Sequence, residues 1–266
     1  GAVDVTTKRD SPAAPTVGGA YVVSSSDSAK FAYTVEASGL PEGTTYEYKM
    51  DDGTWQESAL FDGIEPESQH TFYARAAETD DAEVGDSGRV IVTFDLLQGA
   101  GTVSLDGWTY GDAAETPVLQ SDTNGTDSDS VTLEYKLSSL DDSAYTTDVP
   151  VNAGSYTVRA TFAETAVYSS ATATGTFTIA PRPVTLTWSE STFVYDGTAK
   201  VPTVEVANLV EGDSLVISVE VKKGEASVAE PTEVGDYTAA ATSINQGEGQ
   251  SYLNYTLVDG ANLTHA

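Results

Sequence analysis

The amino-acid sequence predicts an all-β protein built of small sandwich domains in tandem. Three observations carry this prediction. Apolar residues alternate with polar or small ones along many short segments, turn-forming residues separate these segments, and similar stretches recur along the chain. Alternation places successive side chains on opposite faces of an extended strand, so each segment offers one apolar face to a core. Helical spacing of apolar residues is almost absent.

The alternating segments run through the whole chain. They comprise residues 31–36, 71–76, 156–162, 184–188 and 215–219. Turn signals lie around them, at Asp51-Asp52-Gly53, Asn124-Gly125, Asp196-Gly197 and Asp259-Gly260. Glycine and asparagine are favoured there because they tolerate the backbone conformations of tight turns. Many short strands at this spacing are typical of sandwiches and barrels rather than of a parallel α/β sheet.

Internal similarity sets the number of domains. The similar stretches are Thr45–Met50 with Thr132–Leu137, Ala153–Thr157 with Val234–Thr238, and Trp108–Gly111 with Phe193–Gly197. Their offsets of about 80 to 90 residues match the length of an immunoglobulin-like sandwich. We therefore predict three tandem immunoglobulin-like or fibronectin III-like β-sandwich domains, arranged as an elongated rod. The predicted ranges are a flexible lead-in at 1–10 and domains at 11–98, 99–181 and 182–266.

The two joints between these domains differ in composition. Gln98-Gly99-Ala100-Gly101 carries two glycines, which we expect to let the first joint bend freely. Ala180-Pro181-Arg182-Pro183 fixes φ at both prolines and favours extended geometry before each of them. The second joint is therefore expected to be the stiffer one.

Two tyrosines follow a glycine at matching places in the second and third domains. Tyr156 comes two residues after Gly154, and Tyr237 comes two residues after Gly235. A tyrosine at such a corner can place its ring in the core while its hydroxyl bonds to nearby backbone. We predict this structural role for both tyrosines.

Composition excludes several classes of function. Twelve basic and 41 acidic residues give a net charge of −29, which argues against binding to nucleic acid because that would require a basic patch. Membrane insertion is not expected, since no apolar run approaches the roughly 18 residues that a span needs. Cysteine is absent, so disulfides, thiolate chemistry and cysteine zinc sites are excluded. The composition predicts an acidic protein that is monomeric.

The sequence offers few residues for catalysis. Nucleophilic catalysis by serine or threonine needs a positioned base, and the two histidines are His70 and His265. We expect a plain surface role for both. No Gly-x-Ser-x-Gly elbow and no glycine-rich phosphate loop is present. We therefore predict that the protein is not an enzyme and carries no organic cofactor.

The later domains carry the motifs of a known group. Tyr195-Asp196-Gly197-Thr198-Ala199, with Pro202 downstream and Gly235-Asp236-Tyr237-Thr238 beyond, resembles the bacterial immunoglobulin-like surface repeats called MBG and YDG domains. The second domain is similar to the same group at Tyr110-Gly111-Asp112, Asn124-Gly125 and Asn152–Thr157. Near the end of the sequence, Leu263–Ala266 matches Phe177–Ala180. From this match we expect the third domain to stop at or just before its natural boundary.

The first domain resembles a fibronectin type III-like module of bacterial surface proteins, at Asp51–Trp55 and at Gly63-Ile64 followed by Phe72–Arg75. Together these resemblances imply an extracellular location, at the bacterial cell surface or secreted, and a structural spacer within an adhesin. The same modules also serve as ligand-binding tips. The alternative is therefore a glycan- or host-protein-binding module of an adhesin or of a secreted carbohydrate-active enzyme. We favour the spacer because core-forming motifs repeat while no polar site is expected to repeat.

One loop is a candidate calcium site. Between Ser121 and Ser130, oxygen ligands alternate with small residues, namely Asp122, Asn124, Asp127 and Asp129. Calcium takes about 6–8 oxygen ligands, often from a flexible loop, and this loop could supply several of them. The loop lacks the 12-residue pattern that ends in a bidentate glutamate. The alternative is a solvated hairpin loop rich in turn-forming residues.

Trp55 is the candidate ligand residue among the aromatics. It follows the turn at Asp52-Gly53 and could project outward near Tyr46 or Tyr48. An exposed ring there would let a sugar stack on its face. The alternative is that the indole packs over its own hairpin.

Overall fold

The computed structural model describes residues 7–246, 251–258 and 263–265. Regular structure in these residues consists of β-strands and two short 3₁₀-helices, η1 (Asp142–Ala144) and η2 (Ser251–Asn254). The predicted all-β class is confirmed. Residues 1–6 of the expected lead-in and the turn at 259–260 lie outside the described residues. Within the described part, no helix has the length and hydropathy needed to cross a bilayer.

Packing divides the described chain into two compact units. Unit 1 contains the residues up to Gly101 together with 121–132 and 161–172, and unit 2 contains 102–120, 133–160 and the described residues from 173 onward. The predicted ranges 11–98, 99–181 and 182–266 are called the first, second and third domains. Their boundaries stay a prediction, because each compact unit runs across one of them.

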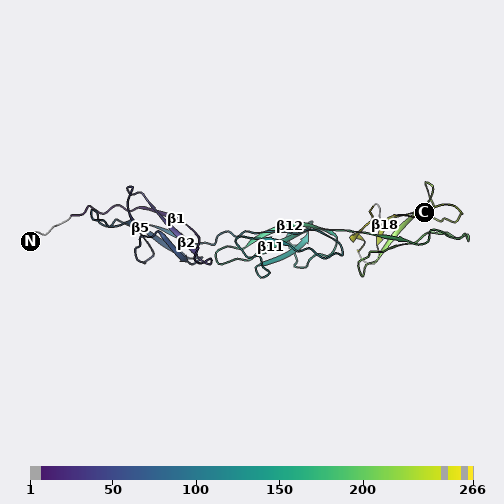
Figure 1. Cartoon of the computed structure of the whole chain (residues 1–266), viewed down its shortest axis with the longest axis horizontal. Helices are drawn as coiled ribbons and strands as arrows, with labels where there is room; N and C mark the ends of the chain where they lie inside the picture. Colours follow the sequence, from purple (N-terminus) through teal and green to yellow (C-terminus); the bar gives the residue numbers. More distant parts are fainter. Residues whose placement is uncertain (1–6, 247–250, 259–262, 266) are drawn as a thin grey trace, which may run out of the picture. The chain divides into compact units, whose positions relative to one another are not determined.

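The first domain is a sandwich of two antiparallel three-stranded sheets, in which β1, β2 and β5 are labelled in Figure 1. One sheet has the order β1-β2-β4, formed by β1 (Thr16–Val23), β2 (Phe31–Ser38) and β4 (Leu60–Ile64). The other has the order β3-β5-β6, formed by β3 (Tyr46–Met50), β5 (Gln69–Ala76) and β6 (Gly88–Thr93). This is the strand order of an immunoglobulin-type sandwich without its strand D.

Aromatic rings fill the core of the first domain. Tyr33 and Phe72 face each other from the two sheets with ring centroids 4.3 Å apart, and both side chains are buried. The remaining buried members of this cluster are Phe31, Val35, Ile64, Phe94 and Val167. Alternation along β2 and β5 therefore places the predicted apolar faces inward.

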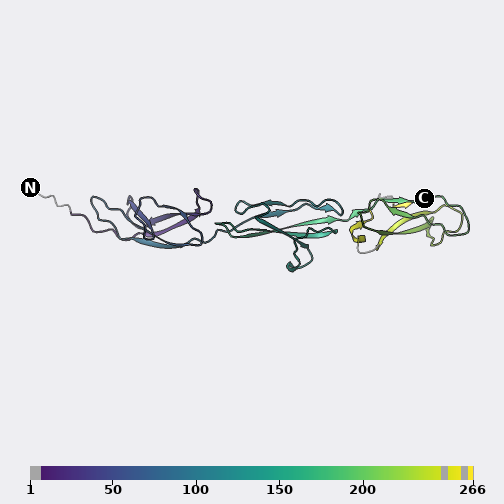
Figure 2. The same cartoon turned by 90° about the horizontal axis from the view of Figure 1, so that it is seen from below.

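The second domain contains a four-stranded sheet of order β10-β11-β12-β8 and a two-stranded sheet of β7 with β9. The strands are β7 (Thr102–Ser104), β8 (Trp108–Thr109), β9 (Val118–Gln120), β10 (Val131–Leu137), β11 (Gly154–Phe162) and β12 (Ala171–Ala180). The short β8 pairs in parallel with the end of β12. The Trp108 ring stacks on Phe177 at 5.2 Å, and Tyr156 stacks on Phe177 at 5.6 Å. Figure 2 shows the same strands in the turned view.

The third domain contains a sheet of order β17-β16-β18-β20 and two strand pairs, β13 with β19 and β14 with β15. The strands are β13 (Arg182–Pro183), β14 (Leu186–Trp188), β15 (Val204–Val206), β16 (Leu215–Lys223), β17 (Ala226–Ser227), β18 (Thr238–Gln246), β19 (Tyr255–Thr256) and β20 (Thr264–His265). The buried core residues are Val184, Leu186, Ala241 and Tyr255.

Both corner tyrosines make the predicted hydroxyl contact. The Tyr156 hydroxyl donates to the Asn152 carbonyl oxygen at 3.0 Å, and the Tyr237 hydroxyl donates to the Glu233 carbonyl oxygen at 3.0 Å. The two rings differ. Tyr156 is buried, whereas Tyr237 is half-buried. The core position is thus confirmed for the first ring and is wrong for the second.

The first joint is closed by backbone contacts within unit 1. The Leu97 amide donates to the Val167 carbonyl at 2.8 Å, and the Ser169 amide donates to the Leu97 carbonyl at 2.9 Å. Val167 itself is buried in the core of the first domain. A Cβ added to Gly99 would lie 2.0 Å from the Ser169 carbonyl oxygen. Gly99 is therefore a position of close approach, and these contacts give no support to a freely bending joint.

The second joint is closed by side chains within unit 2. The hydroxyls of Tyr110 and Tyr255 both donate to Asp213 Oδ2, at 2.8 and 2.6 Å. Arg182 Nε donates to the Tyr110 carbonyl oxygen at 2.7 Å. Burial, and secondarily the hydrogen bond to Asp213, raises the pKa of Tyr255 to about 12. Asp213 thus joins one tyrosine of the second domain to one of the third.

An asparagine adds to the same joint. The buried Asn254 accepts a hydrogen bond from the Ala153 amide at its Oδ1 (2.7 Å) and donates from Nδ2 to Asn152 Oδ1 at 3.0 Å. These bonds reach the corner that holds Tyr156. Both joints thus carry specific contacts, and which of the two is the stiffer stays a prediction.

Candidate functional site

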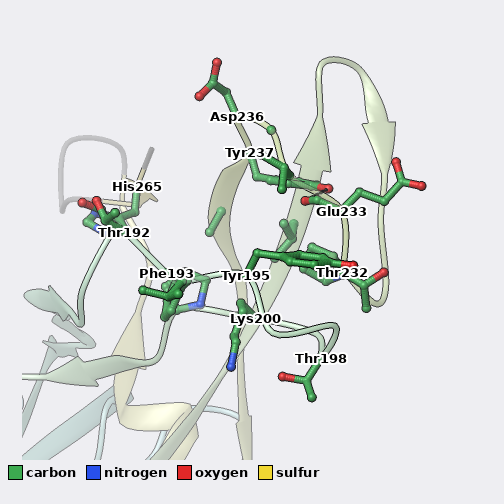
Figure 3. Close-up of a pocket in the computed structure, with 18 residues that line it drawn as sticks. Thr192, Phe193, Tyr195, Thr198, Lys200, Thr232, Glu233, Asp236, Tyr237 and His265 are labelled. Atoms are coloured by element: carbon green, nitrogen blue, oxygen red, sulfur yellow. Dashed lines mark hydrogen bonds between the residues drawn. The ribbon is translucent and has the colours of Figure 1, made fainter.

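The third domain contains a pocket of about 530 Å³ (Figure 3). Two segments form most of its wall, residues 191–202 and the turn 231–239 that leads into β18. Val221 of β16 and His265 of β20 complete the lining. In Figure 3 the rings of Tyr195 and Tyr237 extend in the same direction from the two segments, with Glu233 and Thr232 beside them.

The pocket combines an apolar interior with aromatic and polar walls. Val221 and Ala239 are buried, and Phe193 and Tyr195 are 40% and 66% exposed. Hydroxyl and charged groups line the remainder, namely Ser191, Thr192, Thr198, Lys200, Thr232, Glu233 and Asp236. An apolar interior with a few convergent polar groups is the usual composition of a ligand site.

A hydrogen-bonded turn fixes the outer segment of the pocket. Asp196 Oδ1 accepts from the Thr198 amide at 2.9 Å and from the Thr198 hydroxyl at 2.6 Å. Lys200 Nζ lies 2.7 Å from Asp196 Oδ2, and its backbone amide donates to the Pro231 carbonyl at 3.1 Å. Lys200 first, and then Thr198, hold the pKa of Asp196 far below its usual range. The turn thereby holds residues 196–200 against the 231–239 segment.

His265 lies at the inner side of this pocket rather than in a plain surface position. Its ring is half-buried and stacks on Trp188 with centroids 5.4 Å apart and planes 3° apart. The Nε2 atom is buried and has no hydrogen-bond partner among the described residues. A buried polar atom without a partner carries a free-energy cost. A ligand that hydrogen-bonds Nε2 would remove that cost.

Sequence reasoning missed this pocket because its residues belong to repeated motifs. Tyr195 and Tyr237 lie in stretches whose repetition predicts core positions, and their counterparts in the second domain are Tyr110 and Tyr156. No feature of the motifs themselves distinguishes the buried Tyr156 and half-buried Tyr110 from the half-buried Tyr237 and exposed Tyr195. The useful signal is His265, which stands where the second domain has the fully buried Ile179.

The candidate calcium loop is partly committed to other contacts. Asn124 is buried, its Nδ2 donates to the carbonyl oxygens of Ala163 (2.7 Å) and Ser169 (3.1 Å), and its Oδ1 accepts from Thr123 at 2.7 Å. Asp127 Oδ1 accepts from the Ser130 hydroxyl at 2.8 Å, which lowers the pKa of Asp127. Two of the four candidate ligands therefore have structural roles.

The other two candidates, Asp122 and Asp129, are exposed. In the described part of the chain, no three acidic or histidine side chains gather in a group that could hold a metal ion. Calcium binding by this loop stays a prediction. Its test is the thermal midpoint, which bound calcium would raise and EDTA would restore.

Trp55 is half-buried on the outer face of the β3-β5-β6 sheet of the first domain. The guanidinium carbon of Arg75 lies 4.1 Å from the centre of its ring, and Lys49 Nζ lies 5.4 Å from it. Arg75 also pairs with Glu47, its cross-strand neighbour, at 2.8 Å. The indole thus packs against cations of its own domain, and sugar stacking at Trp55 stays a prediction.

The same cluster recurs in the second domain. The guanidinium carbon of Arg159 lies 3.9 Å from the ring centre of Tyr145, and Arg159 pairs with Glu134 at 2.8 Å. Lys136 Nζ lies 5.3 Å from the centre of the same tyrosine ring. The expectation that no polar site repeats is therefore wrong. In the third domain the strand position opposite Glu220 is Ala240, so this cluster has no arginine there.

Comparisons with known proteins concern the fold. No protein-family model and no curated protein sequence matches the chain. Among solved structures, the chain is similar to the three N-terminal domains of the highly immunogenic outer capsid protein (Hoc) of bacteriophage RB49. The sequence identity is 16%, the match covers 84% of this chain and 82% of that chain, and the TM-score is 0.30. The FN1–FN3 domains of chicken CNTN1 match with 10% identity, 86% and 92% coverage, and a TM-score of 0.22.

Proposed function

We propose that the chain is a non-catalytic structural segment of a bacterial cell-surface or secreted protein, a spacer within an adhesin. The observation that carries this proposal is that both joints between the repeats are tied by specific contacts. At the first joint a residue of the second domain, Val167, completes the core of the first. At the second joint Asp213 accepts from a tyrosine of each domain. Such contacts suit a segment whose task is to hold a fixed spacing.

The charge of the chain fits the same role. Forty-one acidic residues against 12 basic ones keep such a segment soluble and weakly self-repelling, with the repulsion screened beyond about 8–10 Å at physiological salt. This surface does not favour a polyanionic partner.

The spacer role is tested by measuring the spread of distances across the second joint. The chain lacks cysteine, so Asp106→Cys and Glu225→Cys place two unique spin labels at exposed positions of the second and third domains. We expect a narrow distance distribution in the labelled protein and a broad one after Asp213→Ala with Arg182→Ala. Asp236→Ala, which removes an exposed carboxylate elsewhere in the third domain, is the matched control. A distribution that is already broad before these changes would contradict the spacer role.

A second function, ligand binding by the third domain, is favoured by the pocket between residues 191–202 and 231–239. It corresponds to a glycan- or host-protein-binding module of an adhesin or of a secreted carbohydrate-active enzyme. Glycan and protein arrays probed with the full chain test it. Binding that is lost in Tyr195→Ala and kept in Trp55→Ala would place the ligand in this pocket.

A further inference from the structure

The second domain shows what fills the position of the third-domain pocket. There, β8 adds to the sheet beside β12, with Trp108 opposite Ile179 and Thr109 opposite Ala180. The Tyr110 amide donates to the Ala180 carbonyl at 2.9 Å. The Trp108 ring covers Phe177 at 5.2 Å. An extended segment with an aromatic residue thus closes this end of the second domain.

The third domain lacks the equivalent strand. Residues 193–195 correspond to Trp108–Tyr110, and β20 corresponds to the end of β12. Residues 189–203 contain no strand, and in the described residues the sheet ends at β20. The pocket lies between this segment and His265 of β20. Phe193, the counterpart of Trp108, is 40% exposed.

The two domains differ in the residue immediately before the aromatic position. A Cβ added to Gly107 would lie 2.3 Å from the carbonyl oxygen of Thr178, so the second domain needs glycine immediately before its tryptophan. The counterpart of Gly107 in the third domain is Thr192, and the counterpart of Thr178 is Thr264. A threonine Cβ cannot approach a carbonyl oxygen that closely. A segment with Thr192 at this position could therefore not pair with β20 in the geometry that β8 has beside β12.

We propose that the third-domain pocket accepts an extended polypeptide segment from a partner protein, which pairs with β20 and places an aromatic side chain in the pocket. This inference rests on the second function given above. The fitting sequence has glycine before the aromatic residue, because the backbone must approach Thr264 as Gly107 approaches Thr178. Addition of a strand at an exposed edge uses backbone hydrogen bonds for affinity and side-chain pockets for specificity.

Charge and size narrow the partner further. Glu233 and Asp236 are exposed carboxylates in the pocket lining, and Lys200 is engaged by Asp196. The chain as a whole carries a net charge of −29. A neutral or basic segment is therefore favoured over an acidic one. The volume of about 530 Å³ lies within the roughly 300–1,000 Å³ of common ligand pockets, which leaves room for one aromatic side chain and its neighbours.

The test uses the full chain and a labelled peptide as the probe. The peptide has the sequence of Ser104–Asp112 with both aspartates replaced by asparagine, SLNGWTYGN, because the pocket favours a neutral segment over an acidic one. Fluorescence anisotropy should show saturable binding. Replacing the tryptophan of the peptide by alanine should weaken binding at least tenfold. Replacing the glycine immediately before that tryptophan by valine should have an effect of the same size. Amide hydrogen exchange should show new protection at 264–265 and in the pocket walls on adding the peptide.

Thr192→Gly is the decisive protein variant. It lets residues 193–195 pair with β20, so peptide binding should fall at least tenfold while hydrogen exchange slows at 193–195. Ala199→Gly, at an exposed position of the same segment that does not line the pocket, is the matched control and should leave binding within about twofold. Folding of each variant is checked by the exchange of β16 and β18.

Three results would overturn the inference. One is absence of peptide binding to the unmodified chain. Another is binding that Thr192→Gly leaves unchanged. The third is protection of 193–195 in the free protein equal to that of Trp108–Tyr110. If the peptide fails but a saccharide binds in a Tyr195-dependent way, the polypeptide inference is wrong and the ligand-binding function stands. If neither binds, both are wrong.

Discussion

Replacing Asp213 by alanine removes the acceptor that two tyrosine hydroxyls share across the second joint. Tyr110 and Tyr255 donate to the same Oδ2 atom at 2.8 and 2.6 Å. A hydrogen bond to a charged group contributes about 1.5–3 kcal/mol, and a buried donor left without an acceptor costs about 1–3 kcal/mol. Tyr255 is buried while Tyr110 is half-buried, so we take the lower end of the range for each. The expected loss in free energy of unfolding is about 3 kcal/mol.

Urea denaturation followed by tryptophan fluorescence measures this loss. The second and third domains contain one tryptophan each, Trp108 and Trp188, so replacing the other tryptophans by phenylalanine reports on one domain at a time. Separate signals are needed because multidomain chains seldom unfold in a single two-state step. With a urea slope of about 1–3 kcal/mol/M, the transition reported by Trp188 should move down by about 1–3 M.

Two control variants separate the shared hydrogen bonds from the loss of a charge. Asp213→Asn keeps the shape and one oxygen acceptor, so its transition should fall between those of the original protein and of Asp213→Ala. Asp236→Ala removes an exposed carboxylate of the same domain and should leave the transition in place. A loss below about 1 kcal/mol in Asp213→Ala, or an equal loss in Asp236→Ala, would refute the role given to Asp213.

Three further predictions concern other contacts. Gly99→Ala should destabilise unit 1 by about 1–3 kcal/mol in urea unfolding, because the new Cβ would meet the Ser169 carbonyl oxygen at 2.0 Å; an unchanged midpoint would contradict this. Asn124→Ala should lower the thermal midpoint by several degrees, because it strips two carbonyl oxygens of their donor, whereas a calcium-only role would leave the metal-free midpoint unchanged. The pKa of Tyr255 is raised to about 12 in the folded protein, whereas the unfolded chain releases the same proton near pH 10. The stabilisation that this difference gives to the folded state is complete below pH 10, so the free energy of unfolding should fall between about pH 10 and 12. Titration of every tyrosine near pH 10 in the folded protein would refute the last of these.

Strand positions were accessible from the sequence because the cores use strands with one buried face. Residues 31–36 and 71–76 lie inside β2 and β5, and 156–162 lies inside β11. Along such strands, burial follows the same period of two as the apolar residues, so local pattern and tertiary environment agree. The hydroxyl contacts of Tyr156 and Tyr237 could be predicted for a similar reason, since the partner lies four residues away in each case.

The roles of the joint glycines could not be predicted from composition. Glycine serves both backbone freedom and close approach, and only the neighbouring segment distinguishes the two. At Gly99 that neighbour is Ser169, which is 70 residues away in sequence. The partners of Asp213 pose the same difficulty, because Tyr110 lies 103 residues before it.

The repeated cation–aromatic cluster was within reach of the sequence. Thr45–Met50 and Thr132–Leu137 share a glutamate and a lysine at matching places as well as a core tyrosine. The glutamate and the lysine lie on the polar face of both stretches, opposite the core tyrosine. The arginine that completes each cluster lies 28 or 25 residues beyond the glutamate, on the neighbouring strand. Polar residues at matching strand positions are therefore the sequence signal for this cluster.

Gly107 and Thr192 mark a difference between two otherwise similar repeats. Hydropathy and turn signals are the same around Trp108 and Phe193, and both segments contain a tyrosine two residues later. What differs is the residue before the aromatic position. A Cβ at Gly107 would lie 2.3 Å from the Thr178 carbonyl oxygen, so the second domain needs glycine there, whereas the third domain has Thr192. The second domain closes its sheet with its own strand β8, whereas the third domain has a pocket at that place. Thr192→Gly should convert the second arrangement into the first, and exchange protection at residues 193–195 is the direct measure of that conversion.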